Sequence, residues 1–125
     1  MGKQVLLIED EENIAEAIRF ILSRDGHEVA VESDGRDALS RLAEFRPDLV
    51  ILDLMLPGLS GLEILSILRA DAATRDLPIL MLTAKGQGRD REAAEQAGVS
   101  DFMTKPFANA DMRAKVRALL GQPAP

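Results

Sequence analysis

The sequence predicts an α/β domain in which helices cover both faces of a doubly wound parallel sheet. Five apolar runs alternate with five segments of helical period, and such alternation is typical of parallel strands joined by crossover helices. The runs at 49–52 and 79–82 are apolar at every position. Strands buried on both faces have this pattern, because each face then meets a layer of helices.

The composition limits the kind of core and the class of partner. The chain has 125 residues, of which 46% are hydrophobic and only 3% aromatic, so we expect one domain with an aliphatic core. It contains no cysteine, which excludes a disulfide framework and a thiolate metal site. A formal net charge of -6 disfavours direct nucleic-acid binding. No apolar stretch is long enough to cross a membrane, and we expect a cytoplasmic protein.

The first half of the chain begins with an expected strand at 5–8, followed by a helix. Acidic residues at 9–12 open this helix, where carboxylates complement the positive end of its dipole. Its apolar stripe consists of Ile14, Ala17, Ile18, Ile21 and Leu22. Alternation at 28–32 predicts a half-exposed edge strand, and Asp34 is expected to cap a second helix. The apolar stripe of the second helix consists of Ala38, Leu39, Leu42 and Phe45.

The middle of the chain continues the alternation. A strand at 49–53 ends at Asp53, and Ser60 and Glu63 have the spacing of a capping box at the start of a third helix. The apolar residues of the third helix are Leu62, Ile64, Leu65, Ile67 and Leu68. The strand at 79–82 ends at Thr83, and residues 86–88 are predicted to form a mobile loop.

The last two helices differ in their expected packing. The helix after the loop has little more than three alanines as apolar anchors (Ala93, Ala94 and Ala97), so it should be the least firmly packed. A short strand at 101–104 follows, and the apolar positions of the final helix are Met112, Val116, Leu119 and Leu120. We expect the domain to span residues 1–121, with 122–125 as a C-terminal tail or the start of a linker.

Acidic residues follow two of the expected strands. Glu9 and Asp10 follow the first strand, and Asp53 ends the third. If these strands are neighbours, the three carboxylates converge at one edge of the sheet, where parallel sheets bind ligands. A hard cation such as Mg²⁺ would relieve their repulsion, and the carbonyl of Met55 could supply another oxygen. Helix-dipole stabilisation by Glu9 and Asp10, and a turn begun by Asp53, are the structural alternatives.

The fourth strand ends in a hydroxyl at Thr83, and the fifth is followed by an ammonium group at Lys105. Each residue alone is explained as a helix cap or as surface charge. Together with the acids, they suit a phosphoryl group carried on a carboxylate: Lys105 and Mg²⁺ would neutralise its oxygens, and Thr83 would donate to them.

Four sequence blocks, at 7–11, 52–58, 82–84 and 105–107, resemble the signature blocks of the bacterial response-regulator receiver family. The resemblance extends from about residue 3 to about residue 120, and all four blocks occur in order at strand ends. It implies a flavodoxin-like fold with strand order 2-1-3-4-5. His27, the single histidine, lies away from every expected strand end, so we expect it to be a surface residue and neither a ligand nor a phosphate donor.

The resemblance implies a role for each candidate residue. Asp53 would accept a phosphoryl group from a sensor histidine kinase or a histidine phosphotransfer protein. Mg²⁺ would be bound by Asp10 and Asp53, with Glu9 assisting and Met55 offering its backbone carbonyl. The chain would therefore be a signalling domain, which catalyses only phosphotransfer to Asp53 and hydrolysis from it, and not a turnover enzyme.

The remaining implied roles concern the response to phosphorylation. Thr83 and Lys105 would bind the phosphoryl group, with a cis peptide bond between Lys105 and Pro106. Phe102 takes the place of the aromatic switch residue, which is often Tyr in the family. The segment after Thr83 has few large apolar anchors and should yield most easily, so we expect the fourth and fifth strands and their helices to form the output face. This face could serve as a homodimer interface on phosphorylation; the effector is not specified. Met55 and Lys85 occupy variable positions thought to tune phosphoryl lifetime.

Three other function classes share part of this residue pattern. A phosphohydrolase of the haloacid dehalogenase type also uses a strand-end Asp, but it usually carries a second acid where this chain has Met55. A flavodoxin-like cofactor binder would need a phosphate-binding loop after the first strand, where acids stand instead. A pure interaction module would leave the acidic cluster without a purpose. The chain could be free-standing or the receiver part of a longer regulator with an effector domain.

Overall fold

Five parallel strands form the centre of the computed structural model, which describes residues 2–84 and 88–122. The strands are β1 (Gln4–Ile8), β2 (Glu28–Glu32), β3 (Leu49–Asp53), β4 (Ile79–Ala84) and β5 (Asp101–Lys105). Their order in the sheet is β2-β1-β3-β4-β5, which confirms the predicted flavodoxin-like arrangement. The order reverses between β1 and β3, so a cleft for ligands is expected beyond the carboxyl ends of these two strands.

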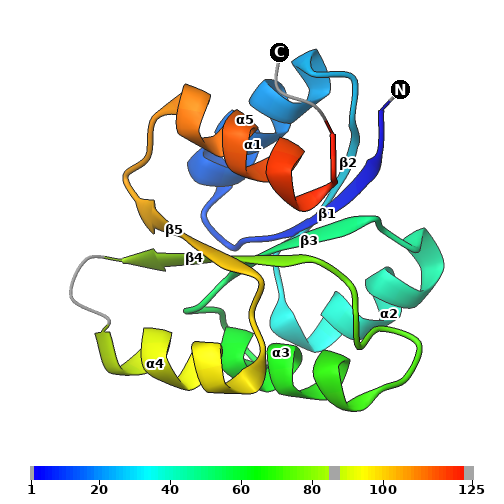
Figure 1. Cartoon of the computed structure of the whole chain (residues 1–125), viewed down its shortest axis with the longest axis vertical. Coiled ribbons are helices and arrows are strands. Elements are labelled where there is room, and N and C mark those ends of the chain that lie inside the picture. Colours follow the sequence, from blue (N-terminus) through cyan, green and yellow to red (C-terminus); the bar gives the residue numbers. More distant parts are fainter. Residues whose placement is uncertain (1, 85–87, 123–125) are drawn as a thin grey trace.

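Helices cover both faces of the sheet (Figure 1). They are α1 (Glu12–Arg24), α2 (Gly35–Phe45), α3 (Gly61–Ala70), α4 (Gly88–Ala97) and α5 (Asn109–Leu119). In Figure 1, α1 and α5 lie above the sheet, and α2, α3 and α4 lie below it. Gly88 begins α4 and is not part of a loop as predicted; residues 85–87, including Lys85, lie outside the described residues. None of the described helices is both long enough and apolar enough to cross a bilayer.

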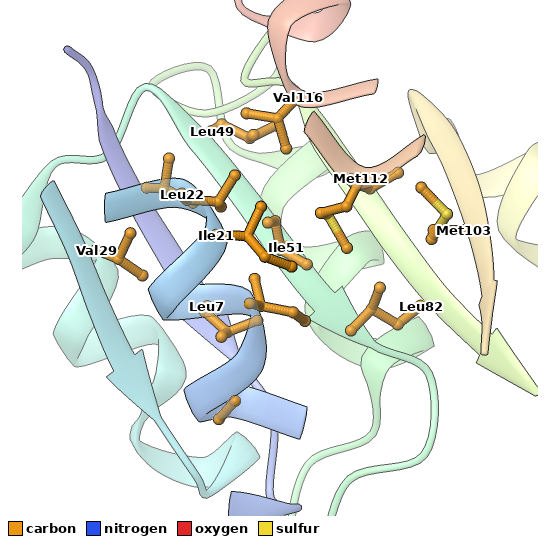
Figure 2. Close-up of a cluster of buried hydrophobic side chains, with 14 residues drawn as sticks. Leu7, Ile21, Leu22, Val29, Leu49, Ile51, Leu82, Met103, Met112 and Val116 are labelled. Atoms are coloured by element: carbon orange, nitrogen blue, oxygen red, sulfur yellow. The ribbon is translucent and has the colours of Figure 1, made fainter. Parts of the chain in front are cut away.

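Alternate residues of the strands supply two separate cores. Leu7, Ile51 and Leu82 pack beneath α1 and α5, together with Ile21 and Met112 of those helices (Figure 2). The neighbouring positions of the same strands, such as Leu6, Leu52 and Met81, pack against α2, α3 and α4 on the other face. Every residue of β3 is buried. The period-2 alternation of side chains explains why the central strands are apolar throughout.

The starts of two helices follow the sequence expectation. Asp34 caps α2 by accepting a hydrogen bond from the backbone N–H of Arg36 at 2.8 Å. Ser60 and Glu63 form a capping box at the start of α3. These caps satisfy backbone N–H groups that have no partner within the helix.

Several burial predictions were wrong. Ala17 and Ala93 are exposed, and Ile67 is 43% exposed, because each lies on the solvent side of its helix beside buried neighbours. His27, predicted to be on the surface, is only 5% exposed. Its Nδ1 accepts a hydrogen bond from the backbone N–H of Lys3 at 3.1 Å, a group just before β1 that needs an acceptor.

Candidate functional site

The acidic residues meet at the carboxyl ends of β1 and β3. Glu9, Asp10 and Asp53 each offer a carboxylate oxygen, and these oxygens lie within 4.8 Å of one another. Glu9 and Asp53 are 1% and 3% exposed, whereas Asp10 is open to solvent. The strand order brings them together, because β1 and β3 are paired in register, with Ile8 beside Leu52.

Lys105 supplies the positive charge of this cluster. Its Nζ lies 3.3 Å from Oε1 of Glu9 and 3.3 Å from Oδ2 of Asp53. The peptide bond between Lys105 and Pro106 is cis. One ammonium group thus pairs with two of the three carboxylates, so acidic groups outnumber basic ones in this cluster.

The pKa values of this cluster reflect burial together with the charges of its members. Burial raises the pKa of Glu9 to about 8, and the adjacent Asp53 carboxylate acts in the same direction. The N–H of Glu11, which donates to Oε2 of Glu9 at 3.1 Å, lowers the pKa only in part. Burial by itself lowers the pKa of Lys105, but the charges of Asp53 and Glu9 more than offset this, so that the pKa is raised overall.

Thr83 is the last residue but one of β4. Because side chains alternate along a strand, Thr83 lies on the same face as Met81, the face that α2, α3 and α4 cover. Thr83 is 1% exposed, and its Oγ1 has no hydrogen-bond partner among the described residues. An unpaired buried hydroxyl costs free energy and calls for an explanation. A ligand oxygen held between Asp53 and Thr83 would satisfy it.

The loop after β3 completes one side of the site. The backbone N–H of Met55 donates to Oδ1 of Asp53 at 3.3 Å, while the Met55 side chain is 64% exposed. The N–H of Gly35, at the start of α2, donates to the carbonyl of Pro57 at 3.2 Å. This bond ties the loop to α2, a link that sequence reasoning missed.

Phe102 lies in β5 and is partly buried against the core of the α2–α4 face. The guanidinium carbon of Arg91, in α4, is 4.6 Å from the centre of the Phe102 ring. Sequence analysis missed Arg91, because nothing in the periodicity of α4 distinguishes it from the other exposed charges of that helix.

The donor set of the acidic cluster fits a divalent metal ion. Mg²⁺ prefers oxygen ligands and retains several waters, and three clustered carboxylate oxygens, one of them from an exposed residue, allow both. Burial and the adjacent Asp53 carboxylate raise the pKa of Glu9, and a bound cation would offset both effects.

The chain is similar both to curated proteins and to solved structures of known proteins. The phosphate regulon transcriptional regulatory protein PhoB of Klebsiella pneumoniae is 38% identical over 125 residues, which are 100% of this chain and 55% of that protein. The chain thus spans about half the length of this curated relative. A putative response regulator from Chloroflexus aurantiacus has a TM-score of 0.92 at 32% identity, covering 98% of this chain and 100% of that chain.

A second solved structure bears on the metal. The receiver domain of a sensor histidine kinase from Pseudomonas aeruginosa PAO1, with a magnesium ion coordinated in its active site cleft, has a TM-score of 0.88 at 32% identity. It covers 98% of this chain and 100% of that chain. The family model of the response regulator receiver domain matches residues 5–117. The chain belongs to the family of response regulator receiver domains, the signalling domains of two-component systems.

Proposed function

We propose that this receiver domain accepts a phosphoryl group on Asp53 from the phosphohistidine of a sensor kinase or a histidine phosphotransfer protein in the cytoplasm. One observation carries the proposal. Oδ2 of the buried Asp53 lies 3.3 Å from the Lys105 ammonium. Thr83, near the end of the neighbouring strand β4, has a buried hydroxyl that lacks a partner among the described residues. A phosphoryl group on Asp53 would be bound by both.

Glu9, Asp10 and Asp53 would hold Mg²⁺, and the carbonyl of Met55 is a candidate for a further ligand. When bound, the ion would supply positive charge against the phosphoryl oxygens, which the three carboxylates would otherwise repel. The magnesium ion in the cleft of the Pseudomonas aeruginosa receiver supports this assignment.

The residues of the chain perform the transfer by position and charge. A carboxylate oxygen of Asp53 forms the new P–O bond while the P–N bond to the donor histidine breaks, and its electron pair stays on the imidazole nitrogen. Lys105 neutralises phosphoryl charge, and the Thr83 hydroxyl donates to a phosphoryl oxygen. Hydrolysis of the acyl phosphate resets the domain, so the chain turns over its own Asp53 phosphate and no external substrate.

We assign residues 1–121 to the receiver and 122–125 to a tail or linker. Because relatives such as PhoB are named as transcriptional regulatory proteins and are longer, we infer that the switch serves an effector, either as an attached domain or as a separate partner, through the α4–β5–α5 face. Phosphorylation-dependent pairing of two copies would use the same face.

The test is labelling by a small phosphodonor such as acetyl phosphate, followed by intact mass. Wild type should gain one phosphoryl group, which hydroxylamine removes as expected of an acyl phosphate, only when Mg²⁺ is present. Asp53→Asn should gain none, whereas Asp48→Asn, at the opposite end of the sheet, should be labelled normally. Labelling of Asp53→Asn at the wild-type rate would refute the acceptor. Multiple-turnover hydrolysis of p-nitrophenyl phosphate that depends on Asp53 would favour a phosphohydrolase instead.

A further inference from the structure

The two ends of α4 are held in very different ways. At the carboxyl end, Arg69 of α3 donates from Nε to the carbonyl of Gly98 at 2.7 Å and from Nη2 to Oγ of Ser100 at 3.3 Å. The same guanidinium donates from Nη1 to the carbonyl of Leu77 at 2.7 Å. These bonds attach the segment after α4 to the core, so this end is fixed.

The amino-terminal half of α4 is held by much less. Ala94 is the residue of this helix that is fully buried, and the side chains of residues 91–93 are exposed. In this half, the guanidinium of Arg91 contacts the ring of Phe102 in β5. A helix fixed at one end and weakly held at the other can pivot at low cost.

Phe102 connects this weak end to the phosphoryl site. In the paired strands, Met81 lies beside Phe102 and Thr83 beside Thr104. Because side chains two residues apart share a face of a strand, Thr83 and Phe102 lie on the same face, the one that α4 covers. The order along this face is therefore Thr83, Phe102, Arg91. Lys105 and Asp53 lie on the alternate positions of their strands.

We propose that Arg91 is a positioning residue of the switch, whose guanidinium holds the Phe102 ring and the start of α4 in the unphosphorylated arrangement. The proposal rests on the proposed function of Asp53. When the Thr83 hydroxyl turns toward a phosphoryl group, space opens beside β4; the ring moves into it and leaves Arg91. The attraction between the cation and the ring face thus opposes switching, and its removal favours the switched state.

The size of the effect follows from the strength of an exposed cation–π contact. Loss of Arg91 should tighten the apparent binding of a phosphoryl mimic about 2- to 5-fold, because binding no longer has to break the contact. The mimic is beryllofluoride with Mg²⁺, titrated into the full chain and followed by amide NMR.

The variants are chosen to separate this contact from charge and from stability. Arg91→Ala should bind the mimic more tightly, and Arg91→Lys, which keeps a cation, should return toward wild type. Arg89→Ala removes an exposed arginine from the same helix and should leave binding unchanged. Phe102→Leu removes both this contact and the ring that fills the space beside β4, so the two effects on binding oppose each other. In the Phe102→Leu background, Arg91→Ala should give no additional gain, because the contact is already absent.

A second measurement does not need the mimic. In the free protein, Arg91→Ala should speed amide exchange in the first turns of α4 and leave residues near Gly98 unchanged, because Arg69 still holds them. Additive effects in the double-mutant cycle, or equal effects of Arg89→Ala and Arg91→Ala, would overturn the role of Arg91 alone. Failure of wild type to bind the mimic through Asp53 would instead overturn the proposed function.

Discussion

Both ends of the sheet bury polar groups, but only one end satisfies them within the chain. At the amino end, Nδ1 of buried His27 accepts from the N–H of Lys3, and Oδ2 of Asp48 accepts from the N–H of Gln4 at 2.8 Å. At the carboxyl end, three carboxylates lie close together, and one ammonium group pairs with two of them. The polar groups at the amino end are thus hydrogen-bonded within the chain. At the carboxyl end, the carboxylates need a further positive charge and the Thr83 hydroxyl needs an acceptor.

The largest expected effect comes from adding one methyl group at each end. A Cβ at Gly2 would collide with the carbonyl oxygen of Gly26, and a Cβ at Gly35 would collide with that of Leu59. Both alanine variants should lose about 1–3 kcal/mol of unfolding free energy in urea. Only Gly35→Ala should also weaken Mg²⁺ binding, measured by NMR titration, because Gly35 holds the loop after Asp53. Equal Mg²⁺ affinities would show that this loop does not position the metal site.

A smaller effect is expected from removing the buried charge of Glu9. Since burial raises its pKa from 4.5 to about 8, the folded state favours the protonated form. The metal-free protein should therefore lose stability as pH rises from about 4.5 to about 8. Glu9→Gln should raise the unfolding free energy at pH 8 by on the order of 1 kcal/mol or more and flatten this pH dependence. Denaturant unfolding at several pH values in EDTA is the measurement; an unchanged slope in Glu9→Gln would assign it to another group.

The amino end should respond to pH with the opposite sign. Burial lowers the pKa of His27 below 6.5, so the unfolded chain takes up a proton before the folded one does. Stability should fall as pH drops below about 6.5, because a protonated Nδ1 cannot accept from Lys3. His27→Asn keeps an acceptor and should reduce this loss by up to about 1 kcal/mol. A profile of His27→Asn identical to wild type below pH 6.5 would contradict the assignment.

The fold was predictable because its signals are local and repeated. Continuous apolar runs identified the buried strands, and Asp34 and Ser60 marked helix starts. The strand order came from the family resemblance and not from periodicity, because a parallel pairing is a long-range choice. His27 was misjudged because burial at the amino ends of strands depends on which N–H groups lack partners, and that is visible only in three dimensions.

The candidate site was predictable for a related reason. Residues at the carboxyl ends of parallel strands converge whenever the strands are neighbours, so Glu9, Asp53 and Lys105 could be grouped from sequence. The position of Arg91 over Phe102 could not, because it depends on how α4 is rotated on the sheet. The same holds for Arg69, whose donors reach a loop 29 residues away along the chain.

The central claim is that the carboxyl end is built to be completed by a metal ion and a phosphoryl group. Thermal unfolding of wild type and Asp53→Asn, with and without Mg²⁺, tests it most directly. Without metal, Asp53→Asn should be the more stable protein, because one of three repelling carboxylates is gone. With Mg²⁺ at about 100 times its dissociation constant, wild type should gain about 2.7 kcal/mol and become the more stable of the two.

Asp48→Asn serves as the matched control, because it changes an acid to an amide at the amino end. It should gain as much from Mg²⁺ as wild type does, and it should show no reversal. The account predicts that the order of stability reverses for Asp53→Asn alone. An Asp53→Asn protein that is already less stable without metal, and that gains as much from Mg²⁺ as wild type, would show that Asp53 is a structural partner of Lys105 and would contradict the account.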